Sequence, residues 1–371
     1  MTLFISHTTA AECWRSGIYD HTLGCTLPSS PFRPAGSIQV ESLSNLLATD
    51  RLQITYQEAF SFGRGQPLKP AKHKPTARRI QIIKGKQLAL ASDPIHVLLP
   101  SKSLANNIRH ITCHVCEGSI PRGSFVRLDN TILLCSPEFT FLQMASTITF
   151  HELVKLGFEL CALYTLHPDG CARYDRILPP TTPSSIAVYL QNHDGAPGVV
   201  AARKALRYVV SASGSPMETA LAIIFCLPQH QGGFGLPLSF MNYRIEERRS
   251  RQAGIGKSYY LCDMYWPKAK LSLEYDSDQE HTGSSRIAED AQRRNNLTSL
   301  GVTSITATRE QVMDPEKLNH IAHQIAQMLG IRMRSERGWS LTERGRLFRK
   351  LVLADGAEFS GTKTRRFFIH S

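Results

Sequence analysis

The chain has 371 residues, of which 42% are hydrophobic and 20% are charged, and its formal net charge is +12. This composition is typical of a soluble globular protein and excludes disordered and fibrous classes; because single cores usually stop growing at roughly 250 residues, we expect two or three domains. No apolar run approaches the roughly 20 residues that cross a bilayer, and the residues from Met1 to His7 lack the pattern of a secretory signal, so we expect a cytoplasmic protein without a membrane segment.

The positive net charge indicates the class of partner. Basic side chains that neutralise phosphates release counterions, and this gives affinity for nucleic acid without any reading of its sequence. The charge therefore favours DNA as the partner over an acidic protein. It leaves the oligomeric state open.

The nine cysteines are scattered along the chain. An odd number of dispersed cysteines predicts buried reduced thiols rather than a disulfide framework. Cys113 and Cys116, with His110 and His114 beside them, have the spacing of half a zinc site. A structural zinc site needs a second pair of ligands at similar spacing, and none follows, so we do not expect zinc.

The first half of the chain divides into three predicted segments. Residues 1–63 mix short apolar stretches with Gly, Ser and Pro and indicate a small helical unit. Residues 64–94 combine prolines with basic residues, which is typical of an exposed connector that either contacts nucleic acid or is merely solvated. Residues 95–183 predict a mixed α/β unit, in which Ser136 caps a helix and Pro137 begins it. Its expected strands cover residues 94–99, 111–115, 125–128 and 131–135.

The run LLCSPEFTFLQMAS, which contains this helix start, resembles a segment of AbiEi-type antitoxins and related bacterial regulators. In those proteins a strand meets a helix that begins with Ser-Pro-Glu. The resemblance covers a short stretch and implies a regulator-like unit over residues 95–183.

Residues 199–330 predict an α/β domain. After a helix with basic residues at 199–210, a second helix begins at Ser215-Pro216, where Glu218 completes a Ser-x-x-Glu capping box. The remaining order is three strands, a helix, a strand and a last helix with one apolar face, which is an αβββαβ plan. The expected ranges are 238–246, 258–265, 270–276, 284–300, 303–308 and 314–329.

Two acidic residues in the predicted strands suggest a metal site. Alternation places Glu274 and Asp276 on one face of their strand. If a tight turn centred on Lys268–Ala269 joins this strand to the preceding one, Asp263 lies opposite Glu274, with Cβ atoms about 4.5–5.5 Å apart. Two carboxylates at that separation can share one Mg²⁺ or Mn²⁺ ion and leave positions for water and a phosphate oxygen.

The segment with Asp263 and Trp266-Pro267, the run LEYDSDQEH and the helix RIAEDAQRRNNLTSLG resembles bacterial very-short-patch-repair-like endonucleases of the PD-(D/E)XK superfamily. The resemblance spans about residues 212–330 and implies a restriction-endonuclease-like core that hydrolyses phosphodiester bonds of DNA. It implies a catalytic set consisting of Glu218, Asp263, Glu274, Asp276 and His281, in which Asp263 and Glu274 are the Mg²⁺ ligands.

Two departures from the superfamily pattern open an alternative. The lysine that gives the superfamily its name is replaced by Asp276, and the usual glycine after it is Ser277. A second metal at Asp276 or a proton relay through His281 would substitute for the lysine. If nothing substitutes, the chain is a non-catalytic DNA-binding or antitoxin-like regulator. A protein-binding adaptor is disfavoured by the net charge and the paired carboxylates.

Several of these residues also have a purely structural interpretation. Glu218 stabilises any helix as part of a capping box, and Asp276 and His281 are ordinary residues for a strand end and a loop. The four-residue spacing of Arg286, Asp290 and Arg294 is typical of a solvated salt-bridge ladder. Residues 331–371 form a basic tail with interleaved aromatic residues, which either contacts nucleic acid or packs on the domain.

Overall fold

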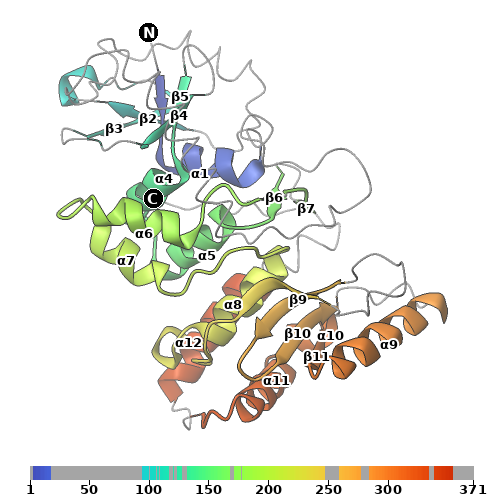
Figure 1. Cartoon of the computed structure of the whole chain (residues 1–371). Coiled ribbons are helices and arrows are strands. Elements are labelled where there is room, and N and C mark those ends of the chain that lie inside the picture. Colours follow the sequence, from blue (N-terminus) through green and yellow to red (C-terminus); the bar gives the residue numbers. More distant parts are fainter. Residues whose placement is uncertain are drawn as a thin grey trace, which may run out of the picture. The chain divides into compact units, whose positions relative to one another are not determined.

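The computed structural model of the chain (Figure 1) comprises two compact units, which meet in the sequence between Val209 and Val210. Helices and strands occur in both units, which confirms the predicted α/β class. His281 and the predicted connector before Pro94 lie outside the described residues. The structure describes residues 3–17, 94–99, 101–105, 107, 109–116, 120, 123–127, 132–167, 171–176, 178–246, 259–276, 284–333 and 338–353.

Five strands of the first unit form one mixed sheet, within the part of the chain described, in the order β3-β2-β1-β5-β4. The central strand β1 runs antiparallel to β2 and parallel to β5. The described N-terminal residues therefore complete this sheet, and the rest of the unit predicted over residues 1–63 lies outside the described residues. The strands are β1 (Leu3–Ile5), β2 (Ile95–Leu99), β3 (Ile111–Val115), β4 (Phe125–Arg127) and β5 (Ile132–Cys135).

Helices cover this sheet and tie its distant parts together. The indole Nε1 of Trp14 in α1 donates to the carbonyl of Cys135 at 2.8 Å. The buried guanidinium of Arg176 donates to the carbonyl oxygens of Trp14 and Tyr164. Charged donors are costly to bury unless such acceptors are present, so these bonds fix the packing of α1. The helices are α1 (His7–Ser16), α4 (Pro137–Met144), α5 (Phe150–Leu160), α6 (Pro183–Gln191) and α7 (Val199–Leu206), and a hairpin pairs β6 (Tyr164–Leu166) with β7 (Ala172–Tyr174).

The helix α4 begins as the sequence predicts. The hydroxyl of Ser136 accepts a hydrogen bond from the amide of Phe139 at 3.2 Å, and Pro137 occupies the first helical position. The sequence had placed the start of the second domain at residue 199, whereas α7 lies in the first of the two compact units. Its small apolar residues Ala202 and Ala205 are buried.

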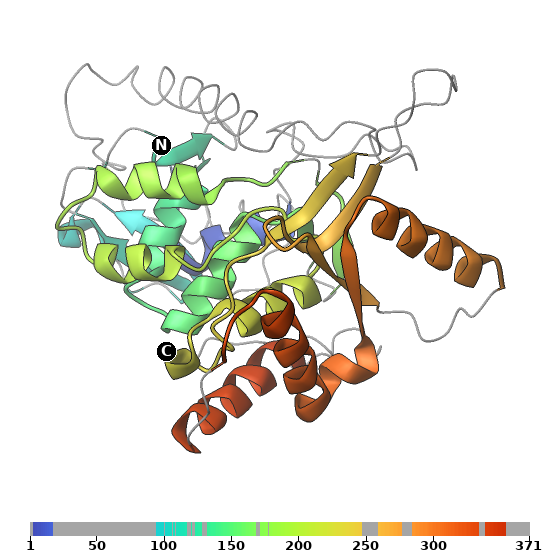
Figure 2. The same cartoon turned by 60° about the horizontal axis from the view of Figure 1, so that its bottom comes forward.

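The second unit contains a sheet of four described strands in the order β11-β10-β9-β8. Within this unit the sheet lies between α8 and α9 (Figures 1 and 2). The succession α8, β8, β9, β10, α9, β11 is the predicted αβββαβ order. The elements are α8 (Pro216–Cys226), β8 (Phe240–Glu246), β9 (Tyr259–Trp266), β10 (Leu271–Asp276), α9 (Ser284–Ser299), β11 (Thr303–Thr308), α10 (Arg309–Met313), α11 (Pro315–Met328) and α12 (Gly338–Phe348).

The pairing of β9 with β10 has the predicted register. Leu271 pairs with Trp266 and Leu273 pairs with Met264, so the turn is centred between Lys268 and Ala269. The side chains of Leu271 and Leu273 are buried, as the alternation in this strand requires. β11 then pairs in parallel with β10 along its whole length.

Part of the predicted basic tail is folded onto this unit. The helix α12 packs against α8 and against the 3₁₀ turn Gln229–Gln231. The guanidinium of Arg344 lies 3.8 Å from the ring centroid of Phe234 and donates to the carbonyl of Gly233 at 2.9 Å. Arg344 is thus engaged within the unit. For Arg344, this contact agrees with the alternative in which the tail packs on the domain.

Candidate functional site

Glu218 lies near the start of α8 and faces β8. The hydroxyl of Ser215 accepts from the amide of Glu218 at 3.2 Å, as the capping box requires. The return bond differs from the prediction, because the Glu218 carboxylate accepts from the amide of Gly214 at 2.8 Å. The same carboxylate oxygen also accepts from the Asn242 side chain at 2.7 Å. Glu218 therefore does more than cap the helix, since it links α8 to the sheet.

Asn242 is a residue of the site that sequence reasoning missed. Its backbone has a φ of 46°, a conformation that Asn tolerates better than most residues. Its amide group donates both to Glu218 and to the carbonyl of Ala212 at 2.9 Å. A polar side chain inside a strand with large apolar neighbours was the available signal.

Asp263 lies in β9 where the regular pairing with β10 ends. The last backbone pair joins Met264 to Leu273. In place of the next pair, the Asp263 carboxylate accepts from the amide of Tyr275 at 2.8 Å. The Asp263 side chain thus takes the place of a backbone acceptor at this point. The hydrogen bond holds its carboxylate against β10.

Glu274 follows on β10 and is held by a second residue that the sequence interpretation did not include. The Nη2 atom of Arg293 in α9 donates to Oε2 of Glu274 at 2.8 Å, and Arg293 also donates to the carbonyl of Leu261. The other oxygen, Oε1, is buried and has no hydrogen-bond partner. Sequence spacing had drawn attention to the neighbouring Arg294, which is exposed.

The charge of Asp263 affects both glutamates. Burial, followed by the charge of Asp263, raises the pKa of Glu218 to about 8. Burial and the same charge raise the pKa of Glu274 to about 7, against the opposing effect of Arg293. Asp263 is therefore the common neighbour of the two acids. A cation at this place would relieve the repulsion and favour the ionised form of both.

The donor set fits a hard divalent cation. Mg²⁺ takes oxygen ligands, keeps several waters and is commonly bound through one or two carboxylates together with substrate phosphates. Asp263 and Glu274 offer such a pair, although the Ser272 hydroxyl and the Cys262 thiol also lie beside the Glu274 carboxylate. Within the described residues, no group of three or more His, Cys, Asp or Glu side chains could hold a metal ion, so Glu218 does not join this pair as a third ligand.

The remaining predicted residues contribute less. Asp276 is exposed at the end of β10. His281 lies outside the described residues, as do the side chains of Arg286 and Asp290. The structure therefore brings together Glu218, Asp263 and Glu274, and leaves the roles of Asp276 and His281 as predictions.

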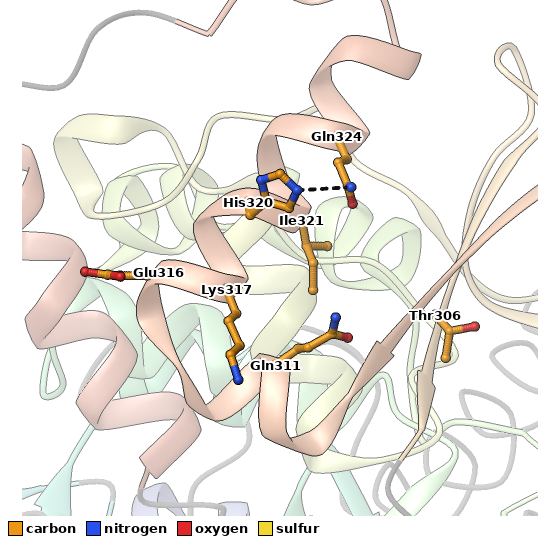
Figure 3. Close-up of a pocket in the computed structure, with 7 residues that line it drawn as sticks. All are labelled: Thr306, Gln311, Glu316, Lys317, His320, Ile321 and Gln324. Carbon is orange, nitrogen blue, oxygen red and sulfur yellow. Dashed lines mark hydrogen bonds between the residues drawn. The ribbon is translucent and has the colours of Figure 1, made fainter.

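A polar cavity of about 510 Å³ lies elsewhere in the second unit, between β11, α10 and α11 (Figure 3). Lys317, which lines it, forms an ion pair with Glu310. None of the predicted catalytic residues lines this cavity, so it is separate from the carboxylate site. Its lining residues are Thr306, Gln311, Glu316, Lys317, His320, Ile321 and Gln324.

The first unit gathers three histidines that the zinc hypothesis had not combined. The rings of His7 and His114 stack with centroids 3.4 Å apart, and Nδ1 of His96 lies 2.8 Å from Nε2 of His114. Burial lowers the pKa of His7 to about 3 and that of His114 to about 4, with smaller contributions from neighbouring histidines, and burial also lowers the pKa of His96. Cys113 and Cys116 are half-buried and form no disulfide. The rings stack on one another, and the described residues form no metal-holding group here.

Comparison with known proteins gives partial matches to curated relatives. An uncharacterized protein of Mycobacterium tuberculosis, from strains CDC 1551 / Oshkosh and ATCC 25618 / H37Rv, is 29% identical over 118 residues, which are 32% of this chain. The chain covers 39% of the length of these curated relatives. No family model and no solved structure matches the chain. In the part of the chain that the structure describes, no helix is long and apolar enough to cross a membrane.

The raised pKa of Glu218 predicts a pH-dependent stability of the second unit. A carboxyl group whose pKa is higher in the folded state stabilises the fold fully below its ordinary pKa of 4.5, and this contribution is lost as the pH rises through about 8. Glu218→Gln keeps the hydrogen-bond acceptor without the charge. At pH 8 and without divalent cations, it should stabilise this unit by about 1–3 kcal/mol.

Hydrogen exchange of peptides from β9 and β10, followed against urea concentration, measures this difference. Glu246→Gln is the matched control, because Glu246 is an exposed carboxylate of the same sheet. If wild type and Glu218→Gln have the same free energy of unfolding from pH 5 to pH 8, the pKa of Glu218 is not raised in the folded protein.

The histidine cluster predicts the opposite pH dependence for the first unit. A histidine whose pKa is lowered in the folded state does not affect the free energy of unfolding above its ordinary pKa of 6.5. As the pH falls below 6.5, it lowers that free energy, down to about pH 4 for His114 and about pH 3 for His7. Each such histidine should contribute a slope on the order of 1 kcal/mol per pH unit. His114→Gln should flatten the acid side of the stability profile, measured by urea unfolding. His110→Asn is the control, since His110 is exposed and has a φ of 71° that Asn tolerates, and this variant should keep the wild-type slope.

Proposed function

We propose that the second unit is a Mg²⁺- or Mn²⁺-dependent DNA endonuclease domain of the restriction-endonuclease-like kind. The observation that carries the proposal is the placement of Asp263 beside Glu274, with the charge of Asp263 acting on Glu218 as well. The net charge of +12 supports a polyanionic substrate. The αβββαβ order and the resemblance to very-short-patch-repair-like endonucleases support the same class.

In this proposal Asp263 and Glu274 hold the ion. When bound, the ion would neutralise charge on the phosphodiester and lower the pKa of the attacking water. The Tyr275 amide donates to one carboxylate oxygen of Asp263 and thereby holds this side chain against β10. Arg293 donates to Oε2 of Glu274, so the ion would bind Glu274 through Oε1.

Glu218 has a separate task in this proposal. The amides of Gly214 and Asn242 hold its carboxylate from the α8 side, and its raised pKa lies near neutrality. A carboxyl group with such a pKa can accept a proton from a water molecule and return it near neutral pH. Asp276 and His281 complete the proposed set in place of the superfamily lysine.

The second candidate function is a non-catalytic DNA-binding regulator that retains the nuclease scaffold. The ion pair between Arg293 and Glu274 favours it, because this contact satisfies one oxygen of Glu274 without any metal. The acidic residue at position 276 favours it too, since no cation is supplied there to position the attacking water. The antitoxin-like run in the first unit, which includes Ser136 and Pro137, would suit such a regulator.

Substitution of the two metal ligands tests the nuclease proposal. Asp263→Asn and Glu274→Gln keep side-chain size and remove the charge that a cation needs. Each should reduce Mg²⁺-dependent cleavage of plasmid and duplex DNA by more than the roughly 10–100-fold typical of outer-shell partners of metal sites. Circular dichroism and duplex binding should stay near wild type.

Three further variants make the test specific. Glu218→Gln should lower cleavage if the acid handles a proton, and should leave it unchanged if it only caps α8. Asp276→Lys should raise activity if the missing lysine limits the reaction. Glu246→Gln, an exposed carboxylate of the same sheet, should cleave like wild type. Two negative results together would support the non-catalytic regulator instead. In the first, the wild-type chain cleaves no form of DNA with Mg²⁺ or Mn²⁺. In the second, calorimetry detects no Mn²⁺ binding that depends on Asp263.

A further inference from the structure

Three aromatic rings form a row across β8 and β9. The ring of Tyr243 stacks on that of Tyr265 with centroids 4.8 Å apart, and Phe240 contacts Tyr243 edge-on at 5.5 Å. Tyr265 is buried, whereas Phe240 is 56% exposed and Tyr243 is 37% exposed. Tyr265 therefore serves as the base of the row, and two rings are presented outward.

The row lies next to the carboxylate site. Tyr243 pairs with Cys262, the residue that precedes Asp263, and Phe240 pairs with Tyr265. If the base of a nucleotide stacked on these rings, its phosphate would lie close to the segment of β9 that contains Asp263. Large rings exposed on a sheet lose hydrophobic free energy unless a partner covers them, so their position beside a polar site calls for a ligand with an aromatic face.

Positive charge borders the row. Lys268 is exposed in the turn that follows Tyr265, and within the described residues it has no ion-pair partner. Lys270 of the same turn instead lies beside Gly301, toward β11 and away from β8. Arg293, which contacts Glu274, is 42% exposed and adds a second cation on the α9 side. Outward rings beside cations match the two parts of a nucleotide, since bases stack on aromatic faces and phosphates bind cations.

We propose that Phe240 and Tyr243 form a stacking platform for an unpaired base of the DNA strand. The inference rests on the proposed function for the phosphodiester at Asp263, and it adds that the bound strand is single-stranded or locally opened there. Bases in an intact duplex are covered on both faces by their neighbours and have no face to offer. Stacking of one base on an aromatic side chain contributes about 1–3 kcal/mol, and it tolerates any base sequence.

Binding in EDTA tests the platform without any cleavage. A labelled oligothymidylate, a duplex oligonucleotide and an oligouridylate are titrated with the full-length chain, and anisotropy is recorded. Phe240→Leu and Tyr243→Leu keep apolar bulk and remove the aromatic face. Each should weaken binding of the single-stranded DNA by on the order of 10-fold and leave duplex binding unchanged. Equal loss for the RNA strand would assign the platform to unpaired nucleotides in general, which also supports it.

A spectroscopic readout separates stacking from loss of structure. A 2-aminopurine placed in the single strand should lose fluorescence on binding to wild type, because stacking quenches it, and should stay bright with either variant. Tyr208→Leu is the control, since Tyr208 is a half-buried tyrosine of the first unit that contacts Phe150. Lys268→Gln should lower affinity for all strands and reduce the salt dependence by about one counterion.

The outcomes distinguish this inference from the nuclease proposal. If both leucine variants bind single strands like wild type and 2-aminopurine stays bright throughout, the platform is overturned even when the chain cleaves DNA. If the variants instead convert a dimer into a monomer in sedimentation without affecting DNA binding, the rings are a self-association surface and the inference is also overturned. If single-stranded DNA binding depends on Phe240 and Tyr243 but the chain cleaves no DNA, the stacking platform is supported and the nuclease proposal is overturned.

Discussion

The antiparallel register between β9 and β10 determines where the polar groups of the candidate site lie. With the turn centred between Lys268 and Ala269, position 263 comes to the Tyr275 amide and position 274 comes under Arg293. A shift by one residue would send the alternating side chains to the opposite faces of the sheet. The aromatic row depends in the same way on the register between β8 and β9, which brings Tyr243 close enough to stack on Tyr265.

The cost of burying charge explains why several hydrogen-bond donors surround the carboxyl groups of Glu218, Asp263 and Glu274. Buried carboxylates are costly, and each one here is given hydrogen-bond donors in compensation: an amide of β10 for Asp263, Arg293 for Glu274, and Asn242 with Gly214 for Glu218. The compensation is incomplete, since the pKa values of both glutamates remain raised. Incomplete compensation is characteristic of sites that await a ligand, although ion-pair networks of purely structural origin also shift pKa values.

Local patterns predicted much of this architecture. The strands at 111–115 and 303–308 occupy their predicted ranges, and the caps of α4 and α8 involve the predicted Ser136 and Ser215. These features depend on residues a few positions apart, whose spacing is visible in the sequence. The β9–β10 register was also predictable, because a tight turn leaves little freedom.

Contacts between distant residues were not predictable in the same way. The strand β1 has only three residues, too few for alternation to show, and it becomes a strand through its pairing with residues 132–134. Arg293 and Asn242 reach the site from other elements, and their roles depend on the packing of α9 and α8. The stacking of His7 on His114 likewise joins residues from two elements far apart in the chain.

The central position of β1 has a consequence for how the first unit folds during synthesis. Its parallel partner begins at Ile132, and its antiparallel partner contains Val97. The middle strand is thus synthesised before both of its neighbours. The sheet cannot close until β5 emerges, so the unit folds late and with a high contact order. A substitution that weakens the three-residue strand Leu3–Ile5 would accordingly act on the centre of the sheet and on the pairing of both neighbouring strands.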